Sequence, residues 1–579
     1  MAVTETNTKN RNPKGESGDH LCFSVSRPIV PLVILLFTAA FMGINQYGIG
    51  IKDHCIRIPF LKAFADSGLY GQDYMVACKN YLYTIVWPSL GMILRYVPVS
   101  IEWMFFGFHV ISIYGLFYGL FYLGKVLFGR DDVSLLAMTL LLFRGQGLGA
   151  VSTASSIFLS RNLALPFLIF AVILFLKEKW LPTLMLLGIG FLIHPLSSGY
   201  VIIIVILYLI LHFREIDHRQ AISGLVLLLA IASPIFLWRL HQSPQTNPVI
   251  APKEWEMLLR LRSPHHVFPF LWPRDEFFRM FLFIPVFLAA FRYKPERKHH
   301  QKTAFFMAAI FLLCLSGTVF TEWIPLTAVI QMQLFRVTKW ILFLGAFYYA
   351  NFFITGLSGR PSPRAFIPVA FLSAGVLYNA VFWKEAFLII MACSGVCFIW
   401  VYLKENKSYP VIWSRILLTA VVGMTAVGLG RHGIDVRIRE ETTWRSVQEW
   451  ARHHTPVKSI FIVPPGRFGF RIGSERAIYG DWMDGTMMFL SPDFGFEWIR
   501  RMRNLGFEDS LGIRGFENLD KLSGRYNALS SGQIRHIAAE FPAGEYSVYL
   551  VMEKERQDNA FRKVYRNGRY TVYKIVPGQ

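Results

Sequence analysis

The residues best suited to chemistry lie in a polar stretch near the start of the chain. Residues 50–80 read GIKDHCIRIPFLKAFADSGLYGQDYMVACKN, follow the first apolar segment and are too polar to cross a bilayer. A carboxylate in such a loop can act as general base toward an acceptor hydroxyl, or it can hold a divalent metal ion. We predict that Asp53 is the catalytic or acceptor-orienting acid and that Asp73 is the second candidate.

Basic residues are expected on the same side of the membrane as this loop. Arg144 and Arg161 flank the third and fourth apolar segments, and Arg336 and Lys339 open the tenth. Polar groups at membrane depth tend to line a cavity or a substrate path, and the planar guanidinium matches phosphate oxygens. We predict that Arg336, Lys339 and Arg161 bind a donor phosphate and that Arg144 lies in the same pocket. Alternatively, Arg336 and Lys339 anchor the chain at the membrane interface.

The remaining candidates also have a structural alternative. Asp53 can cap a helix, and Asp73 follows Gly-Gln, which fits a turn. We place His54 in the pocket, where it can also be a metal ligand, although a single loop histidine is more often not a ligand. His194 precedes a proline and can either end a helix or face the pocket.

The composition places the chain among membrane proteins that cross the bilayer several times. Of its 579 residues, 54% are hydrophobic and only 17% are charged, and the mean hydropathy is +0.39. The net charge of +21 comes largely from short connections between apolar segments, where membrane topology places basic residues. No basic stretch is interleaved with stacking aromatic residues, so we do not expect a nucleic-acid partner.

The apolar segments predict about thirteen transmembrane helices. They lie near Ile29–Tyr47, Trp103–Leu127, Val133–Leu148, Leu163–Leu176, Leu181–Ile193, Tyr200–His212, Ala221–Trp238, Phe277–Phe291, Ala304–Phe320, Thr338–Phe353, Ala365–Val381, Ala386–Leu403 and Val411–Leu429. The segment Tyr83–Val97 is apolar on one side only, and we expect it to lie along the membrane surface.

The distribution of basic residues predicts the orientation. With residues 1–27 as a cytoplasmic tail before an uncleaved first span, the basic connections fall on the cytoplasmic side. These connections contain Lys125/Arg130, Lys177/Lys179, Arg214/Arg219, Arg292–Lys302, Arg360/Arg364 and Lys404/Lys407. The opposite side then receives the first large loop, residues 50–100, and everything after the transmembrane part, residues 28–430.

Residues 431–579 have the composition of a soluble α/β domain. Trp444, Val447 and Trp450 recur at helical spacing, and the segments SIFIVPP, EYSVYLVM and RYTVYKIV predict strands. In the first loop, Cys55 and Cys78 can form a disulfide if it faces an oxidising compartment, or both can remain free.

Three segments carry a resemblance to a known group of enzymes. They are IPFLKAFADSGLYGQDYMV, SRNLALPFLIFAVILFLKEKWLPTLMLLGIGFLIHPLSSG, and WRSVQEWARHHTPVKSIFIVPPGRFGFRIGSERAIYGDWMDG. With the topology above, the chain resembles the GT-C glycosyltransferases, and within them a poorly characterised bacterial branch. The resemblance implies an α-helical polytopic fold of the GT-C type that uses polyprenyl-phosphate-linked sugars outside the cytoplasm.

The last of these segments also resembles the start of the outer domain of oligosaccharyltransferase catalytic subunits. Both share the order helix, Thr-Pro, strand, turn motif, arginine and acid, here ending in Arg476 and Asp481, so Arg476 joins the pocket candidates. This chain has VPPGRFGF where those subunits have WWDYG, so sequon glycosylation is not expected. GT-C enzymes commonly pair two acids in the first loop, but Asp53 and Asp73 are isolated, which leaves a requirement for Mg²⁺ or Mn²⁺ open.

The resemblance implies a function at the bacterial cytoplasmic membrane. A sugar would pass from a polyprenyl-phosphate donor to an envelope glycan, lipid or protein acceptor, as in envelope polysaccharide biosynthesis. Two alternatives remain: a transporter or flippase for a lipid-linked glycan, and a non-catalytic scaffold in which the fold has lost its chemistry. The absence of an internal repeat argues against the transporter, and the missing acid pair favours the scaffold.

Overall fold

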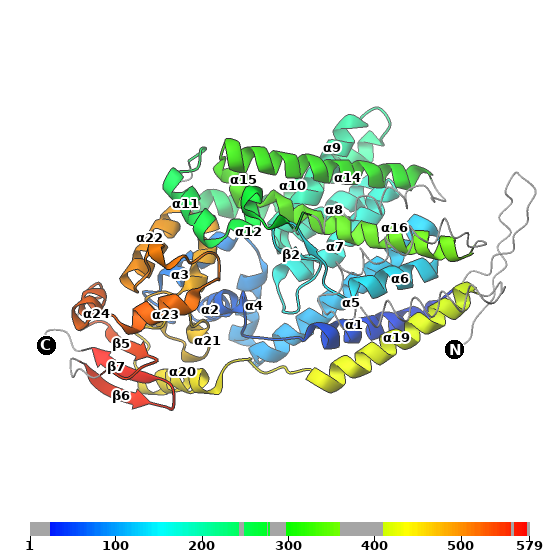
Figure 1. The fold of residues 1–579 in the computed structure, drawn as a ribbon. Coiled ribbons are helices and arrows are strands. Elements are labelled where there is room, and N and C mark those ends of the chain that lie inside the picture. The colour runs from blue at the N-terminus through cyan, green and yellow to red at the C-terminus, as the bar shows by residue number, and fades with distance from the viewer. Residues whose placement is uncertain are drawn as a thin grey trace, which may run out of the picture.

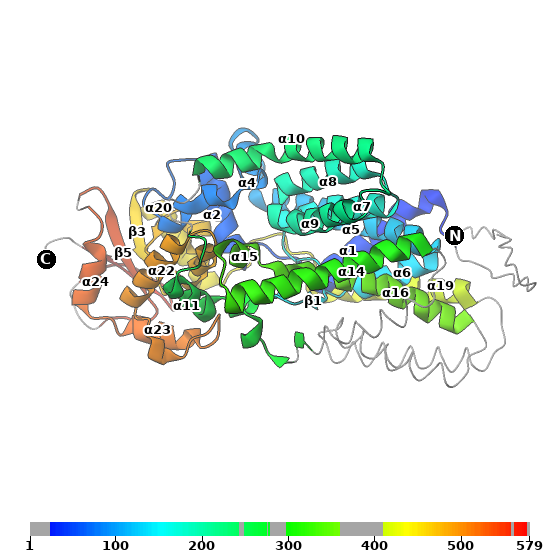
Figure 2. The ribbon, with the colours of Figure 1, turned by 90° about the horizontal axis from the view of Figure 1, so that it is seen from above.

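The structure is a computed structural model. It describes residues 24–242, 248–274, 276–277, 297–358, 409–542, 544–556 and 561–575. Long helices run side by side through most of the molecule, and a region of shorter helices and one sheet lies at one end of them (Figures 1 and 2).

The bundle consists of apolar helices connected at two opposite ends. Its helices are α1 (Val30–Asn45), α5 (Ile101–Phe128), α6 (Asp131–Leu141), α7 (Ser160–Leu176), α8 (Trp180–Ile193), α9 (Pro195–Leu211), α10 (His218–Gln242), α14 (Arg297–Thr318), α16 (Lys339–Ser358) and α19 (Tyr409–His432). Within the described residues, four segments are long and apolar enough to cross a bilayer, namely Arg27–Asn45, Ile101–Phe128, His218–Gln242 and His299–Trp323. These segments indicate an integral membrane protein.

Helices occupy most of the predicted spans. Those predicted at Ala365–Val381 and Ala386–Leu403 lie outside the described residues, as does Phe277–Phe291 except for its first residue. The segment Val133–Leu148 differs from its prediction, because α6 ends at Leu141 and a two-stranded hairpin follows. The hairpin pairs β1 (Gln146–Gly147) with β2 (Val151–Ser152), and the glycines before and within its turn interrupt the helical pattern.

The first large loop forms short helices that cover one end of the bundle. These are α2 (His54–Ala65), α3 (Tyr74–Ala77), the 3₁₀ helix η2 (Cys78–Leu82) and α4 (Val86–Tyr96). In α4 the side chains of Trp87 and Leu90 are buried, whereas Met92 and Tyr96 are exposed. The predicted amphipathic character of this segment is therefore confirmed.

The C-terminal region contains a five-stranded mixed sheet in the order β4-β3-β5-β7-β6. Strand β3 is parallel to β4 and β5, and β7 is antiparallel to β5 and β6. The three strands predicted from the sequence are β3, β5 and β7. The bounds are α20 (Thr442–His454), β3 (Ser459–Ile462), α21 (Phe470–Ser474), β4 (Ala477–Ile478), η6 (Trp482–Phe489), α22 (Pro492–Asn504), η7 (Asp509–Leu511), α23 (Leu519–Asn527), α24 (Ser531–Ala538), β5 (Ser547–Met552), β6 (Arg562–Arg566) and β7 (Thr571–Ile575).

Several contacts fix the C-terminal region on the loops at this end of the bundle. Lys62 of α2 forms an ion pair of 2.6 Å with Glu475. The indole of Trp255 donates to the Met488 carbonyl oxygen at 3.0 Å. Trp255 lies in α11 (Lys253–Arg262), which is followed by α12 (Pro264–Val267), η3 (Pro269–Leu271), η4 (Val319–Trp323), α15 (Thr327–Met332) and η5 (Leu334–Thr338). The loops and the C-terminal region therefore form one continuous packed layer.

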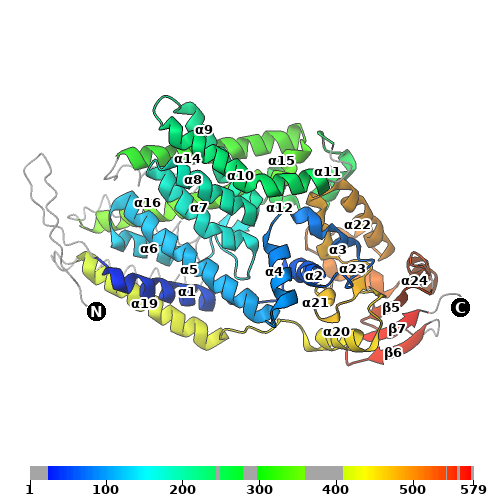
Figure 3. The ribbon, with the colours of Figure 1, turned by 180° about the vertical axis from the view of Figure 1, so that it is seen from behind.

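Helix α19 connects the bundle to that layer. It runs beside α1 along the length of the bundle (Figure 3). The two helices approach closely at Gly43 and Gly428, where a Cβ atom on Gly428 would lie 2.8 Å from the Gly43 carbonyl carbon. A larger side chain at either position would push the two backbones apart.

Candidate functional site

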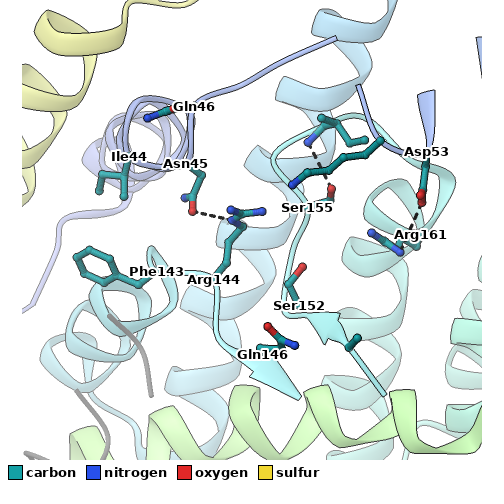
Figure 4. Close-up of a pocket in the computed structure, with 13 residues that line it drawn as sticks. Ile44, Asn45, Gln46, Asp53, Phe143, Arg144, Gln146, Ser152, Ser155 and Arg161 are labelled. Atoms are coloured by element: carbon teal, nitrogen blue, oxygen red, sulfur yellow. Dashed lines mark hydrogen bonds and ion pairs between the residues drawn. The ribbon is translucent and has the colours of Figure 1, made fainter. Parts of the chain in front are cut away.

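A cavity of about 550 Å³ lies where the bundle meets the first loop. Its walls come from the last residues of α1, the turn before α2, the hairpin after α6 and the start of α7 (Figure 4). The lining residues are Ile44, Asn45, Gln46, Lys52, Asp53, Phe143, Arg144, Gln146, Ala150, Ser152, Ser155, Ile157 and Arg161. A volume of several hundred cubic ångströms is typical of small-molecule sites.

Asp53 lies immediately before α2 and faces this cavity. Its side chain is 37% exposed, and its Oδ2 lies 3.9 Å from Nη1 of Arg161, which is an ion pair too long to be a hydrogen bond. Among the cavity-lining residues that the structure describes, Asp53 is the one acid. The predicted acid and the predicted phosphate ligand Arg161 therefore lie together.

The surroundings of Asp53 are strongly cationic. Burial raises the pKa of its carboxyl, but the charges of Arg161, Arg57 and Arg336 lower that pKa by more, so it lies below its usual value. Asp53 is therefore ionised at neutral pH, as a general base must be. The same interactions place Arg336 within electrostatic reach of Asp53, although the two are far apart in sequence.

Two of these arginines have buried nitrogen atoms without an acceptor. Nη1 of Arg57 and Nε of Arg336 are shielded from solvent and make no hydrogen bond with the part of the chain that the structure describes. Burial and the repulsion of Arg161 and Arg57 lower the pKa of Arg336 to about 10, against the opposing charges of Tyr200 and Asp53. A buried donor without an acceptor is costly, and an anion that supplies oxygen atoms would remove that cost.

Lys339 and His194 lie next to this cationic group and contact the same helix. Nζ of Lys339 donates to Ser197 Oγ at 3.2 Å, and Nδ1 of His194 accepts from the Ser197 backbone nitrogen at 3.1 Å as the cap of α9. Burial and the charges of Lys339, Arg161 and Arg336 hold the pKa of His194 well below its usual value. Lys339, one of the predicted phosphate ligands, and His194 are thus within electrostatic reach of Arg161 and Arg336. None of Lys339, His194 and Arg336 is among the residues that line the cavity.

Arg144 also lines the cavity. Its Nε donates to Asn45 Oδ1 at 3.0 Å and its Nη1 to Ser156 Oγ at 3.4 Å. These two neutral acceptors fix the guanidinium at the end of α1 without neutralising its charge.

His54 holds the turn that carries Asp53. Its Nδ1 accepts from the Gly50 backbone nitrogen at 3.2 Å, so its Nε2 is the donor to the Phe158 carbonyl oxygen at 2.7 Å. Burial lowers its pKa to about 4, which keeps the ring neutral. Because both nitrogens are engaged, His54 acts here as a link between the Asp53 turn and the segment that leads to Arg161.

Asp73 lies in a different environment, between the first loop and the C-terminal region. Its Oδ1 accepts from the backbone nitrogens of Met75 and Val76 as the cap of α3, and its Oδ2 accepts from Arg471 Nε at 2.6 Å. Arg471 also donates to both carboxylate oxygens of Asp484, at 2.7 and 2.9 Å. The side chain of Asp73 is fully buried in this cluster and does not line the cavity.

The last pocket candidate and the two loop cysteines also lie in packed surroundings. Arg476 donates through Nη2 to the carbonyl oxygens of Arg452 and Thr455, each at 2.7 Å, so it joins the end of α20 to β4. Cys55 and Cys78 are free thiols. None of the three lines the cavity.

The donor set of the cavity does not fit a divalent cation held by the protein alone. Mg²⁺ and Mn²⁺ require several oxygen ligands, usually including carboxylates. Asp53 is the single described carboxylate in the lining, and the described residues contain no group of three or more histidine, cysteine or acidic side chains that could hold a metal.

The sequence reasoning did not select several residues that the fold brings to this site. The cavity is also lined by Lys52, Asn45, Gln146 and Ser152. The charge of Arg57 lowers the pKa of Asp53. Arg57 had a detectable signal, because it follows Asp53 by four residues at the start of a helix, where such pairs share a face. The hairpin residues had none, since the segment resembled a continuous span.

Comparisons with known proteins give limited information. A family model described as "Domain of unknown function (DUF6798)" matches residues 442–505, from α20 to the end of α22. The search of curated proteins found no match. Among solved structures, the chain is similar to ArnT from Cupriavidus metallidurans bound to undecaprenyl phosphate, with a TM-score of 0.47, 12% identity, and coverage of 96% of this chain and 99% of that one.

The same protein in the apo state gives a TM-score of 0.46 and 11% identity over 95% of this chain and 98% of that one. Likenesses of this strength support no conclusion about the reaction or the substrates of this chain. The chemistry of the cavity has to be inferred from its own residues.

Proposed function

We propose that this protein is a membrane glycosyltransferase of the GT-C type. It transfers a sugar from a polyprenyl-phosphate-linked donor to an envelope glycan, lipid or protein acceptor on the extracytoplasmic side of the bacterial cytoplasmic membrane. The observation that carries the proposal is one ionised carboxylate, Asp53, which faces a cavity at the end of the helix bundle within electrostatic reach of three arginines. Two of these arginines have a buried nitrogen without an acceptor among the described residues.

The cationic group suits the phosphate of the donor. Arg161, Arg57 and Arg336 all act electrostatically on Asp53, and two of them have a buried nitrogen without a partner among the described residues. Guanidinium groups bind phosphate oxygens through directed, charge-assisted hydrogen bonds. Fixed cations at this position also stabilise the charge that develops on the phosphate as it leaves.

Asp53 supplies the complementary function. The acceptor hydroxyl oxygen attacks the anomeric carbon, its proton passes to the Asp53 carboxylate, and the bond from that carbon to the phosphate oxygen breaks with its electron pair on the phosphate. The lowered pKa keeps Asp53 ionised before the reaction. The attraction of Arg161 also orients the carboxylate toward the cavity.

The ends of the bundle support the proposed orientation. Asn45 ends α1, Ser160 begins α7 and Lys339 begins α16, all next to the cavity and the C-terminal region. The predicted cytoplasmic lysines Lys125 and Lys177 lie at the opposite ends of α5 and α7. This distribution follows the positive-inside rule when the cavity faces away from the cytoplasm.

Binding of a polyprenyl phosphate tests the proposal directly. The protein is reconstituted in lipid nanodiscs, and a fluorescent polyprenyl phosphate is compared with the corresponding polyprenol. We expect the phosphate to bind more tightly, and Arg336→Gln and Arg57→Gln each to weaken it about ten- to hundred-fold, because each removes a charge-assisted hydrogen bond. Arg566→Gln is the matched control, since its side chain is 59% exposed and lies in β6 of the C-terminal region.

Equal binding of phosphate and polyprenol, or unchanged affinity in both arginine variants, contradicts the proposal. A flippase is distinguished by a second measurement in liposomes. Translocation of the lipid without an acceptor, unaffected by Asp53→Asn, would favour transport over sugar transfer.

A further inference from the structure

The cavity contains a second cationic pair that the donor phosphate does not require. Lys52 and Arg144 both line it, in addition to Arg161. Figure 4 shows Arg144 beside Asn45 and above Gln146, whereas Asp53 and Arg161 lie on the other side of the view. The inference below rests on the proposed function, because it concerns what shares the cavity with the donor phosphate.

Lys52 is held in an unusual backbone conformation. Its φ is 53°, in the left-handed region that side-chain-bearing residues seldom adopt, and the conformation directs the chain through the sharp turn before α2. Its ammonium group makes no hydrogen bond or ion pair with the described residues, although the carboxylate of the next residue, Asp53, acts on it electrostatically. Partial burial and the charges of Arg144 and Arg161 hold the pKa of Lys52 below its usual value.

Arg144 is rigidly placed but not neutralised. Two of its nitrogens donate to neutral oxygens, those of Asn45 and Ser156, and the structure describes no hydrogen bond from Nη2. Burial and the charge of Arg161 lower its pKa. A planar guanidinium with a free edge in a cavity is suited to a carboxylate or phosphate.

The rest of this side of the cavity is uncharged, with polar residues of the hairpin beside the apolar side chains of Ile44 and Phe143. Gln146 and Ser152 are cross-strand partners at the base of the hairpin, and Ser155 follows them. The hairpin is fixed from behind, since Nδ1 of His266 lies 3.0 Å from the Gly149 carbonyl oxygen. Amide and hydroxyl groups on a fixed hairpin can hydrogen-bond to the hydroxyls of a sugar ring.

The charges in the cavity are therefore unbalanced. The lining contains three cations and one described carboxylate, Asp53, which already faces Arg161 and two further arginines. Lys52 and Arg144 repel each other and Arg161, and a second anion between them would remove that repulsion. A cationic amino sugar would be repelled by these cations, and the described lining offers no acid besides Asp53 to bind it.

We propose that Lys52 and Arg144 form a second anion subsite, which binds a carboxylate or phosphate on the molecule that meets the donor phosphate in this cavity. Two sources can supply this group. It is either the carboxylate of an acidic transferred sugar or an anionic group on the acceptor. Gln146 and Ser152 then contact the neutral hydroxyls next to it.

The test measures a second ligand on protein saturated with polyprenyl phosphate in nanodiscs. D-Glucuronate represents the acidic sugar, glycerol phosphate represents an anionic acceptor, and D-glucose is the neutral control. By saturation-transfer NMR we expect at least one anion to bind about ten-fold more tightly than glucose. Preference for glucuronate assigns the subsite to the sugar, and preference for glycerol phosphate assigns it to the acceptor.

Lys52→Gln and Arg144→Gln should each weaken anion binding about ten-fold while leaving polyprenyl phosphate affinity within about two-fold. Lys458→Gln is the control, because its side chain is 64% exposed in the C-terminal region. Glucose binding as tightly as both anions, or anion binding unchanged in both variants, overturns the subsite.

The experiment also distinguishes failure of the proposed glycosyltransferase function from failure of the anion subsite. If polyprenyl phosphate does not bind the wild type, the same anions are titrated into the unsaturated protein. Binding that Lys52→Gln and Arg144→Gln abolish still supports the subsite without the glycosyltransferase, whereas no binding overturns both.

Discussion

Asp53 and Asp73 belong to the same loop but have opposite surroundings. Asp53 is a single carboxylate among Arg161, Arg57 and Arg336, partly exposed to a cavity. Asp73 is one of three buried carboxylates around the single guanidinium of Arg471. The first arrangement has cations in excess and room for a ligand, and the second is saturated with hydrogen bonds.

The comparison explains why one acid is suited to chemistry and the other to structure. Asp73 receives bonds from two backbone nitrogens of α3, from Arg471 and from the Ile478 nitrogen, which leaves its oxygens no capacity for a substrate. Asp53 has one long ion pair and faces the cavity. The number of acceptors already in use therefore distinguishes the two acids better than their positions in the sequence.

The largest expected effect separates the two acids directly. Asp53→Asn should lower sugar transfer about 10²- to 10⁴-fold, the usual contribution of a general base, without lowering the melting temperature. Asp73→Asn should lower the melting temperature, because it breaks a buried pair with Arg471. The measurement combines thermal unfolding with release of polyprenyl phosphate from whichever glycosyl donor in a panel the wild type consumes.

Asp509→Asn is the control for this pair, since Asp509 is exposed in the C-terminal region. If Asp53→Asn and Asp73→Asn lose sugar transfer equally while both proteins remain fully folded, the two acids do not have the different roles inferred here.

The next effect concerns the saturated cluster. Arg471→Met leaves Asp73 and Asp484 without their shared partner, and breaking such a buried pair typically costs about 3–5 kcal/mol. We expect a clear fall in melting temperature in detergent. Arg437→Met should leave it unchanged, because that side chain is exposed. An Arg471→Met protein as stable as the wild type would show that the cluster does not hold the loop to the C-terminal region.

A smaller effect is expected where His54 supports the Asp53 turn. His54→Phe leaves the buried Gly50 nitrogen and Phe158 oxygen without partners, at a cost of about 1–3 kcal/mol each, and lets Asp53 shift. Transfer should fall about ten-fold while polyprenyl phosphate affinity is retained, because the arginines are intact. His54→Asn keeps an acceptor near Gly50 and should recover part of the rate. Equal loss of binding and rate would instead indicate general damage to the site.

Much of the architecture was predictable from the sequence. Apolar segments and basic connections predicted the bundle helices, and alternating apolar residues predicted β3, β5 and β7. The hairpin at Gln146–Ser152 was not predicted, because the apolar pattern continues into it and only its glycines indicate a break. Its position against α16 depends on contacts that no local pattern encodes.

The site was predictable in part. The types of residue pointed to Asp53, Arg161, Arg336 and Arg144, which the fold brings together from different elements. Asp73 had the same signal as Asp53, an acid in a polar loop. The difference is that Asp73 pairs with Arg471, which lies 398 residues later in the chain. Pairing over such a separation is visible only in the folded structure.

The smallest expected effect is on the pH dependence, because the rate of sugar transfer should change little as the pH is lowered. In the proposed mechanism Asp53 acts as its carboxylate, and the charges of nearby arginines outweigh burial and lower its pKa. A carboxyl with a lowered pKa stays ionised until the pH falls through that pKa, below the usual value of about 3.9. Protonation of Asp53 should therefore change the rate of sugar transfer by less than about two-fold between about pH 5 and pH 7.

In the buried cluster around Arg471, the pKa of one carboxyl is shifted in the opposite direction. Burial and the repulsion of Asp484 raise the pKa of Asp481 well above its usual value. A pH profile in which transfer falls with a midpoint near 6 would require a different proton acceptor, either a histidine or a carboxyl whose pKa is raised in this way. Because the arginines around Asp53 cannot raise its pKa, such a midpoint would move the base away from the cavity, and Asp53→Asn would then leave the profile and the rate unchanged.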